Sequence, residues 1–315
     1  MKNCILKPFL VLCFILNIFS NCKAQILVNG KKANQYTFRG QFDKEDYDRL
    51  KNSTVYYMCS PNVENKELLE TEIKKAWTYS KIEVIYFSEF GDHENEENAA
   101  FFSLGINRTV NEIISVYMNL WCYKMYGDNK GYLDYAKINL MYDCEVNNVF
   151  KKDIWTTDNV FEYLFKTPDP DNLKPGILPT YLIAIQETLE NQKKLEDYEN
   201  IIKKDKLKKL KDETIYITEN VVLKEICHTE KWDLKELMSK CPFKYKIISY
   251  EELNEKILNN EPIVFILANR VEIQRRSFFM FDNRTKECLY KVKAGGRGGF
   301  WARDFELLGK LIFKE

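Results

Sequence analysis

The sequence predicts an α+β protein made of two tandem related modules, each a mixed β-sheet with helices packed on it. One stretch occurs twice, at residues 106–118 and 268–280, with Asn-Arg, Ser and Met repeated at a constant offset of 162. Around both copies, β-rich apolar runs and amphipathic helical stretches follow in one order, β-α-β-β-β-β-α. A strand, a helix and a strand in succession favour a right-handed parallel crossover, and the later hairpins are antiparallel. We therefore expect two mixed sheets, joined by a proline-rich segment and a long helix.

The N-terminus has the pattern of a secretory signal peptide over residues 1–24. Lys2 and Lys7 supply the charged start, and residues 9–19 form an apolar run too short to span a bilayer. Ala24 gives an acceptable cleavage position. We expect an exported protein, either periplasmic or on the cell surface.

Cys22 raises a lipoprotein alternative, although Asn21 is a poor small residue to precede a lipidated cysteine. No later stretch is long and apolar enough for a membrane helix. Loss of the signal removes three lysines and no acid, which leaves 44 basic and 47 acidic residues and a net charge of −3. This composition gives no basic footprint for nucleic acid and no polybasic membrane anchor.

We divide the 315 residues into five segments. They are a signal peptide (1–24), an N-terminal strand and short helix (25–52), the first module (53–168), a proline-rich connection with a long charged helix (169–212), and the second module (213–315). In the N-terminal segment, residues 26–28 form a strand before an Asn-Gly turn, and Asp43 caps a helix that runs through Leu50.

The first module begins with a β-rich run at 54–59. Asn65 then caps a helix whose apolar face carries Leu69, Ile73 and Trp77. Strands are expected at 82–87, 99–106, 114–123 and 135–142, with a glycine-bounded turn at 127–131 before the last. A Trp-x-x-Asp sequence at 155–158 opens the closing helix.

The second module repeats this order. Strands are expected at 214–218, 245–250, 263–267, 277–281 and 288–292, with a hairpin turn at 282–285. Asp233 caps the helix after the first strand, and Trp301 opens the last helix. In that helix Trp301, Phe305, Leu308 and Ile312 form one apolar stripe.

Between the modules lies a break in composition. Four of the eight prolines fall between residues 168 and 179, and Thr180 then caps a helical stretch that is expected to reach about Lys211. Its second half is rich in lysine. The lysines form either a contact for an anionic surface or a solvated helix face, and we favour the solvated face.

A glycine-rich loop is the most suggestive candidate site. It consists of Gly295, Gly296, Arg297, Gly298 and Gly299, after a strand and before a helix. Glycines let backbone N–H groups converge on an anion, which Arg297 can complete. The loop matches no nucleotide-binding motif, and we favour the interpretation that it is a flexible connection that lets the last helix fold back on the sheet.

Arg108 and Arg270 occupy matching positions after the third strand of each copy. They form either two equivalent anion or carboxylate contacts, or arginines that stack over the edge of the sheet beside a retained Asn turn. We favour the second interpretation and keep both residues as candidate partner contacts.

The sequence gives little support for a metal site or for a reactive cysteine. Six cysteines remain after cleavage, most of them inside apolar runs, so buried free thiols are expected; only Cys227 and Cys241 form a possible disulfide. The acidic loop at 92–97 has oxygens that suit calcium, but its order fits no calcium loop and a solvated loop is favoured. No catalytic motif is present, and we expect no cofactor and no resident metal.

The sequence around 211–217 and 243–253, with the later hairpin and glycine loop, resembles a group of uncharacterised exported bacterial proteins of the Bacteroidota type. The order of elements is also similar to the small α/β domain at the N-terminus of TolB-like envelope proteins. That resemblance implies binding to other proteins, although this chain has two copies and no propeller repeats.

The leading hypothesis is a non-enzymatic interaction module of the bacterial envelope, which meets an unknown protein partner at the surface between the two copies. One alternative is a small-ligand or anion-binding protein, or an enzyme, that uses the glycine loop. The other is a structural protein stabilised by calcium at the loop 92–97.

Overall fold

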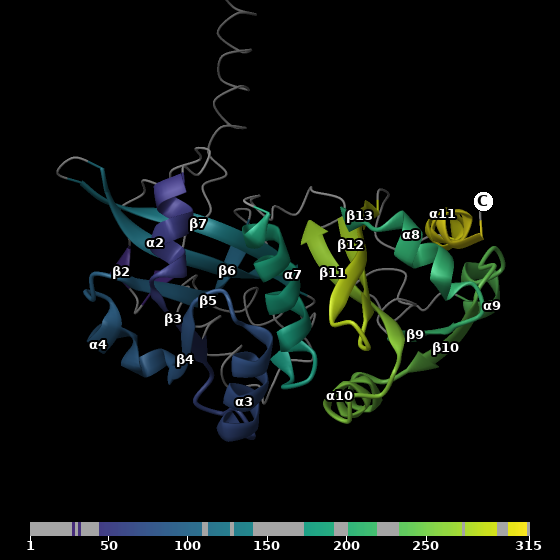
Figure 1. Ribbon diagram of the computed structural model, residues 1–315, viewed down its shortest axis with the longest axis horizontal. Coiled ribbons are helices and arrows are strands. Elements are labelled where there is room, and N and C mark those ends of the chain that lie inside the picture. The colour runs from purple at the N-terminus through teal and green to yellow at the C-terminus, as the bar shows by residue number, and fades with distance from the viewer. Residues whose placement is uncertain are drawn as a thin grey trace, which may run out of the picture.

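The computed structural model describes residues 27–28, 31–32, 44–108, 113–126, 129–140, 173–191, 201–218, 233–272, 275–294 and 302–313. Within them the protein is α+β, with one mixed sheet of five strands and one of six, and helices packed on both (Figure 1). This confirms the predicted fold class. A separate two-stranded ribbon, β1 (Leu27–Val28) with β2 (Lys31–Lys32), confirms the short N-terminal strand.

The first sheet has the strand order β4-β3-β5-β6-β7. Its strands are β3 (Thr54–Cys59), β4 (Lys81–Tyr86), β5 (Ala99–Arg108), β6 (Ile113–Tyr126) and β7 (Asn129–Leu140). β3 is parallel to both of its neighbours, while β5, β6 and β7 are antiparallel. Helix α3 (Lys66–Ala76) connects β3 with β4, and Asn65 caps it by accepting a hydrogen bond from the Leu68 N–H at 2.9 Å.

The second sheet has the order β10-β9-β11-β12-β13-β8. Its strands are β8 (Ile201–Ile202), β9 (Thr214–Thr218), β10 (Lys244–Ile248), β11 (Val264–Glu272), β12 (Arg275–Asp282) and β13 (Glu287–Ala294). β9 is parallel to β10 and β11, and β11, β12 and β13 are antiparallel. The first five strands therefore repeat the order and directions of the first sheet, and β8 is an addition on the outer edge of β13.

The repeated stretch of sequence forms the same β-hairpin in both sheets. Asn107 lies opposite Ser115, and Asn269 lies opposite Ser277. The neighbouring pairs keep the same offset: Leu104 with Met118, and Ile266 with Met280. The duplication is thus visible as an identical strand register, which a one-residue slip would destroy by turning every side chain to the other face.

The remaining helices cover the two sheets. They are α2 (Lys44–Lys51), α4 (Phe90–His93), α7 (Leu178–Glu190), α8 (Lys204–Leu207), α9 (Leu234–Leu237), α10 (Tyr250–Leu258) and α11 (Ala302–Phe313), with 3-10 turns η1 (Phe87–Glu89) and η3 (Lys208–Leu210). Helix α11 buries Phe305, Leu308 and Ile312, as its predicted stripe requires. The closing helix predicted from residue 155 in the first module lies outside the described residues.

One expected helix is shorter than predicted. Helix α7 ends at Glu190, whereas the sequence suggested a helix that continues to about Lys211. Instead Ile201 and Ile202 form β8, which pairs with Lys291 and Tyr290 of β13. Two isoleucines favour a strand, and the open edge of β13 supplies a partner for it. The local helical pattern gave no indication of this distant partner.

Helix α10 was not predicted. The strand predicted to end at Tyr250 stops at Ile248, and Ser249 then caps α10 by accepting a hydrogen bond from the Glu252 N–H at 3.1 Å. Ser-x-x-Glu before an apolar pattern is the sequence signature of a helix start, so the information was present in the chain.

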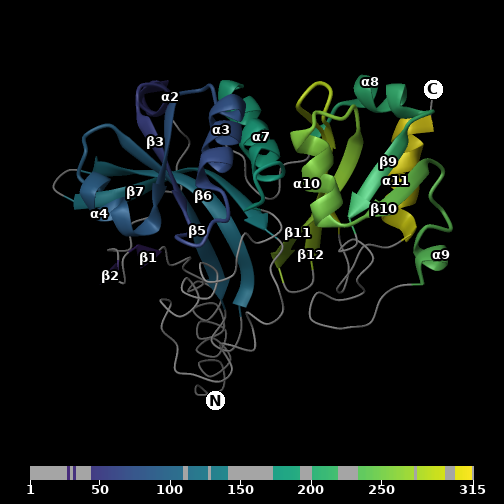
Figure 2. The same cartoon turned by 90° about the horizontal axis from the view of Figure 1, so that it is seen from below.

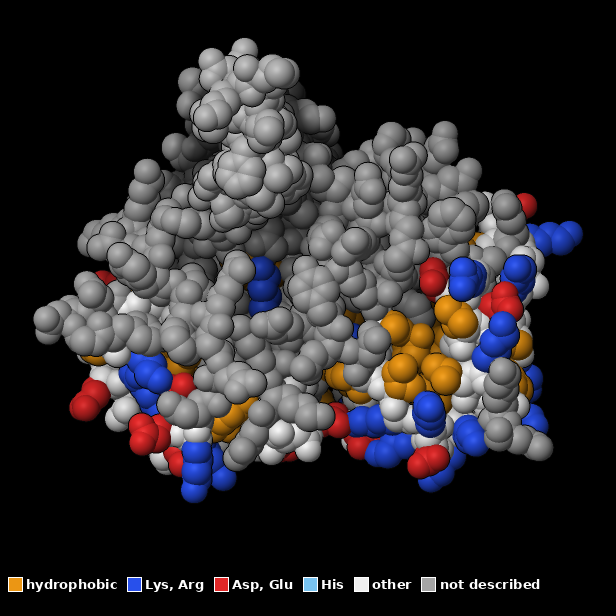
Figure 3. Space-filling model, turned by 90° about the horizontal axis from the view of Figure 1, so that it is seen from above, with side chains coloured by type: hydrophobic (Ala, Val, Ile, Leu, Met, Phe, Trp, Pro, Cys, Tyr) orange, Lys and Arg blue, Asp and Glu red, His pale blue; other side chains and the backbone are white. Residues whose placement is uncertain are grey.

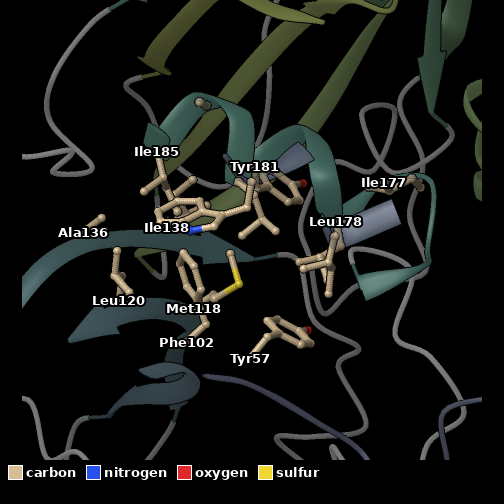
Figure 4. Close-up of a cluster of buried hydrophobic side chains, with 14 of the residues drawn as sticks. Tyr57, Phe102, Met118, Leu120, Ala136, Ile138, Ile177, Leu178, Tyr181 and Ile185 are labelled. Atoms are coloured by element: carbon tan, nitrogen blue, oxygen red, sulfur yellow. The ribbon is translucent and has the colours of Figure 1, made fainter. Parts of the chain in front are cut away.

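Helix α7 lies between the two modules (Figure 2). Its Leu178, Tyr181 and Ile185 lie over side chains of the first sheet, including Phe102 and Met118 (Figure 4). The same helix also packs against the second sheet, and one continuous hydrophobic core contains buried residues of both. A second core lies on the far face of the second sheet, under α8, α9 and α11.

Candidate functional site

The two predicted arginine contacts lie at the outer ends of the duplicated hairpins. Arg108 is the last residue of β5 and is opposite Ile113, and Arg270 is opposite Arg276. The strand register shifts at this point in both copies, between Asn107 and Arg108 in the first and just after Arg270 in the second. Such bulges re-aim side chains and are common beside functional sites.

In the second module, the strand register places Arg270 two strands away from the residue that precedes the glycine loop. Arg270 is level with Arg276 on β12, and Arg276 is level with Ala294, the last residue of β13. Ala294 directly precedes Gly295 in the chain. The loop from Gly295 to Gly299, including Arg297, lies outside the described residues, but the chain enters it from this row of arginines.

The two hairpins also meet each other. β11 of the second sheet lies against β6 and β7 of the first, and both hairpins extend toward the same side of the molecule (Figure 2). We call the two hairpin ends, residues 106–108 with 113–115 and residues 268–272 with 275–278, the hairpin junction. Its residues include four arginines, at 108, 270, 275 and 276, and the acid Glu272, and Glu112 lies in the chain between residues 108 and 113. In the sequence, arginine is therefore more frequent than acid at the two hairpin ends.

The acidic loop at 92–97 is partly anchored on the first sheet. Glu96 accepts a hydrogen bond from the Tyr56 hydroxyl at 2.6 Å, and its other oxygen lies 2.8 Å from Nδ1 of His93. The His93 ring stacks on Tyr56 with centroids 4.2 Å apart. These contacts, the Tyr56 hydrogen bond first, lower the pKa of Glu96. Among the described residues, no group of three or more His, Cys, Asp or Glu side chains can hold a metal ion.

The described cysteines are free thiols. Cys59, Cys122 and Cys288 are buried, as expected, and burial raises the pKa of Cys288 to about 12. Burial also raises the pKa of Cys241 to about 11, and its Sγ lies 3.5 Å from the carbonyl oxygen of Phe243. Because nucleophilic attack needs a thiolate, these groups are unreactive at neutral pH. Cys227 lies outside the described residues, so its pairing with Cys241 stays a prediction.

Sequence reasoning missed a buried polar row on the first sheet. Nε1 of Trp121 donates to the Ser103 hydroxyl at 2.8 Å, Ser103 donates to Oδ1 of Asn119 at 3.0 Å, and Nδ2 of Asn119 donates to Asp134 at 3.2 Å. The row crosses β5, β6 and β7 and fixes their mutual register. Polar residues inside otherwise apolar strands were the available sequence signal.

The same positions in the second sheet are apolar. At the offset of 162, Ser103 corresponds to Phe265 and Asn119 to Phe281, and both phenylalanines are buried in the core shared with α7. Tyr181 meets Phe281 edge-on with centroids 6.3 Å apart. The two copies have therefore diverged on this face, and only the second uses it to pack against α7.

Exposed apolar side chains do not define one docking surface. Figure 3 shows hydrophobic side chains gathered over the second module, with lysines and arginines around them. Of the described residues, the large hydrophobic side chains that are exposed are Met125, Ile202, Tyr245 and Leu307. They belong to four different elements in the two modules, so the hairpin junction remains the better defined candidate.

Comparison with known proteins gives no relative: no family model, no curated protein and no solved structure matches the chain. No helix among the described residues is long and apolar enough to cross a membrane.

Proposed function

We propose that the chain is a non-enzymatic interaction module, exported to the bacterial envelope, that binds a protein partner at the hairpin junction. The observation that carries this proposal is the meeting of the two duplicated hairpins, each with its Asn-Arg at a bulge. Arginine is enriched where protein interfaces carry their binding energy, because its guanidinium makes several directed hydrogen bonds.

The shared core makes this surface suitable for recognition. Because α7 is packed between both sheets, the two modules share one core and are joined by more than the connecting segment. A preorganised surface loses less conformational entropy when it binds. Export is supported by the signal-like pattern of residues 1–24, with its charged start and short apolar run.

A second candidate function is small-anion binding at the glycine loop. The row of Arg270, Arg276 and Ala294 favours it, because this row leads directly into Gly295 and Arg297. A ligand screen by thermal shift, with Arg297→Ala as the control, tests this reading. Stabilisation by an anion that disappears in Arg297→Ala supports it.

The interaction hypothesis is tested by crosslinking the tagged mature chain in its native envelope and identifying captured proteins by mass spectrometry. One partner recovered in stoichiometric amount supports an interaction module. Recovery of abundant envelope proteins only, at the level of an unrelated tagged control, contradicts it and leaves the anion-binding function.

A further inference from the structure

We infer that the second module docks on an anionic lipid bilayer through the outer surface of α8, η3 and α11. This inference goes beyond the proposed function, because it concerns other residues and another kind of partner. The three elements cover one hydrophobic core, in which α8 and η3 bury Leu207 and Leu210 while α11 buries Phe305, Leu308 and Ile312. α11 packs against both α8 and η3 (Figure 1). Since all three turn their apolar sides into the same core, their other sides form one outer surface.

Exposed lysines are concentrated on the part of this surface that α8 and η3 form. Residues 203–213 contain six lysines and three acids. Four of these lysines are exposed and make no ion pair with any residue that the structure describes, namely Lys204, Lys208, Lys209 and Lys211. Like charges that stand together without partners repel one another, and an anionic surface removes that repulsion.

The neighbouring acids reduce this excess of positive charge but do not remove it. Glu213 and Glu287 are each paired with a base, which leaves Asp205 and Asp212 exposed among the four lysines. α11 itself is balanced, with two bases and two acids. The mature chain has a net charge of −3, so an excess of bases on this surface means a larger excess of acids elsewhere. Such an uneven distribution orients a protein on an anionic surface, although the composition of the whole chain shows no polybasic anchor.

The outer side of α11 adds an apolar side chain beside the lysines. Arg303, Leu307 and Lys310 follow one another at helical spacing and are exposed, and the exposed fraction of Leu307 is 43%. Glu306 lies 2.6 Å from Lys310 and 3.6 Å from Lys240, so its charge is compensated. A single exposed leucine is ordinary. Among bases on the outer side of a helix, however, it is placed to enter the boundary between headgroups and acyl chains while the bases meet the headgroups.

The type of basic residue favours a bilayer over a protein as the occupant. Arginine is enriched in protein interfaces and lysine is depleted there. Lysine carries a compact charge on a flexible stem, which suits a diffuse layer of phosphate groups better than directed, paired hydrogen bonds. A single phosphate ion cannot reach lysines that are spread over α8, η3 and the residue after them, whereas a bilayer presents many headgroups at once.

The test measures binding of the mature chain to vesicles of phosphatidylglycerol and phosphatidylcholine in equal amounts, with vesicles of phosphatidylcholine alone as the neutral surface. Binding is measured by co-sedimentation at low salt. The test variant replaces the four unpaired lysines by glutamine, at positions 204, 208, 209 and 211. The control removes the same charge from exposed positions of α2 and α3, as Lys44→Gln, Lys51→Gln, Lys74→Gln and Lys75→Gln. Because each lysine near an anionic surface contributes about fivefold in affinity, we expect at least about a hundredfold loss in the test variant and less than about tenfold in the control.

Two further variants do not depend on how well the lysine variant folds. Asp205→Asn with Asp212→Asn removes the exposed acids among the lysines and is expected to strengthen binding at least about threefold. Leu307→Ala is expected to weaken binding about threefold because it removes apolar area from the contact, whereas Met125→Ala, at an exposed position of β6, should leave it unchanged. Binding of the wild type should weaken at least about tenfold between low and physiological salt.

The inference fails if the chain does not bind anionic vesicles or binds neutral ones equally well, if the two lysine variants lose the same affinity, or if removal of Asp205 and Asp212 weakens binding. Release of the chain by inorganic phosphate at the concentration of the lipid headgroups also overturns it, because that result identifies a single-ion site. Displacement by soluble polyglutamate together with unchanged binding of Leu307→Ala overturns it in favour of an acidic protein as the occupant.

Discussion

Tyr181 of α7 stands edge-on to Phe279 of the second sheet, with ring centroids 5.8 Å apart, while the same helix lies on the first sheet. The helix is therefore a common layer between the duplicated modules, and both bury apolar surface against it. The consequence is cooperative stability, because neither module keeps its core if the other unfolds.

Replacement of Tyr181 by Ala is expected to lower the free energy of unfolding by about 3–5 kcal/mol, since a large aromatic group is removed from a fully buried position. Amide exchange should then accelerate in both sheets. Tyr245→Ala, at an exposed position of β10, serves as the control and should change stability by less than about 0.5 kcal/mol. Faster exchange in only one sheet contradicts a shared core.

Replacement of Thr218 by Val is expected to stabilise the protein by about 1 kcal/mol. Thr218 is fully buried at the end of β9, and its hydroxyl has no hydrogen-bond partner among the residues that the structure describes. The matched control is Thr188→Val, because the buried Thr188 hydroxyl donates to the Ala184 carbonyl at 2.8 Å and its loss should destabilise by about 1 kcal/mol. Urea denaturation of both variants checks this, and equal effects of the same sign refute the assignment.

Replacement of Tyr56 by Phe should make the free energy of unfolding depend less on the ionisation of Glu96. The Tyr56 hydroxyl is the main cause of the lowered pKa of Glu96. The stability that this hydrogen bond gives the folded protein is therefore present above the ordinary glutamate pKa, and it is lost as the pH falls through the pKa of Glu96 in the folded protein. The stability difference between wild type and Tyr56→Phe should stay below about 1 kcal/mol at pH 7, because solvent screens Glu96, and should shrink toward about pH 3.

The control for this pH experiment is Tyr132→Phe. The Tyr132 hydroxyl hydrogen-bonds with Tyr123, and Glu94 is only the smallest of the causes that act on its pKa, so the effect of its loss should follow glutamate titration much less than that of Tyr56→Phe. If the stability difference between wild type and Tyr56→Phe stays constant from neutral to acidic pH, the ionisation of Glu96 does not depend on this hydrogen bond.

Replacement of Gly105 by Ala is expected to cost about 1–3 kcal/mol. The two residues Gly105 and Tyr117 lie opposite each other, and a Cβ at position 105 would lie 2.4 Å from the buried Tyr117 ring. In a Tyr117→Leu background the same substitution should cost much less. An unchanged cost in that background, measured by a double-mutant cycle, excludes this steric explanation.

The sequence predicted the fold where local patterns repeat. Asn65 caps α3 as expected, and the hairpins at 106–118 and 268–280 share their register because the same residues recur. What the sequence did not predict depends on distant partners. β8 forms because β13 offers an edge, and the polar row at Ser103 is recognisable only once β5, β6 and β7 are aligned.

The candidate site was predicted in part. Arg108 and Arg270 were identified from the duplication alone, but Arg276 was not, because its relation to Arg270 exists only across two strands. The meeting of β11 with β6 and β7 depends on how α7 packs the modules together. No local pattern encodes that arrangement.

The most direct test of the account places a photo-crosslinking amino acid at position 276 of the hairpin junction and, in a matched variant, at Lys74 on the outer face of α3, where the side chain is 50% exposed. Both variants are irradiated in the native envelope. If the hairpin junction binds the partner, one covalent adduct of defined mass forms at position 276 and none forms at position 74. Equal crosslinking at the two positions, or none at position 276, contradicts the hairpin junction as the partner-binding surface.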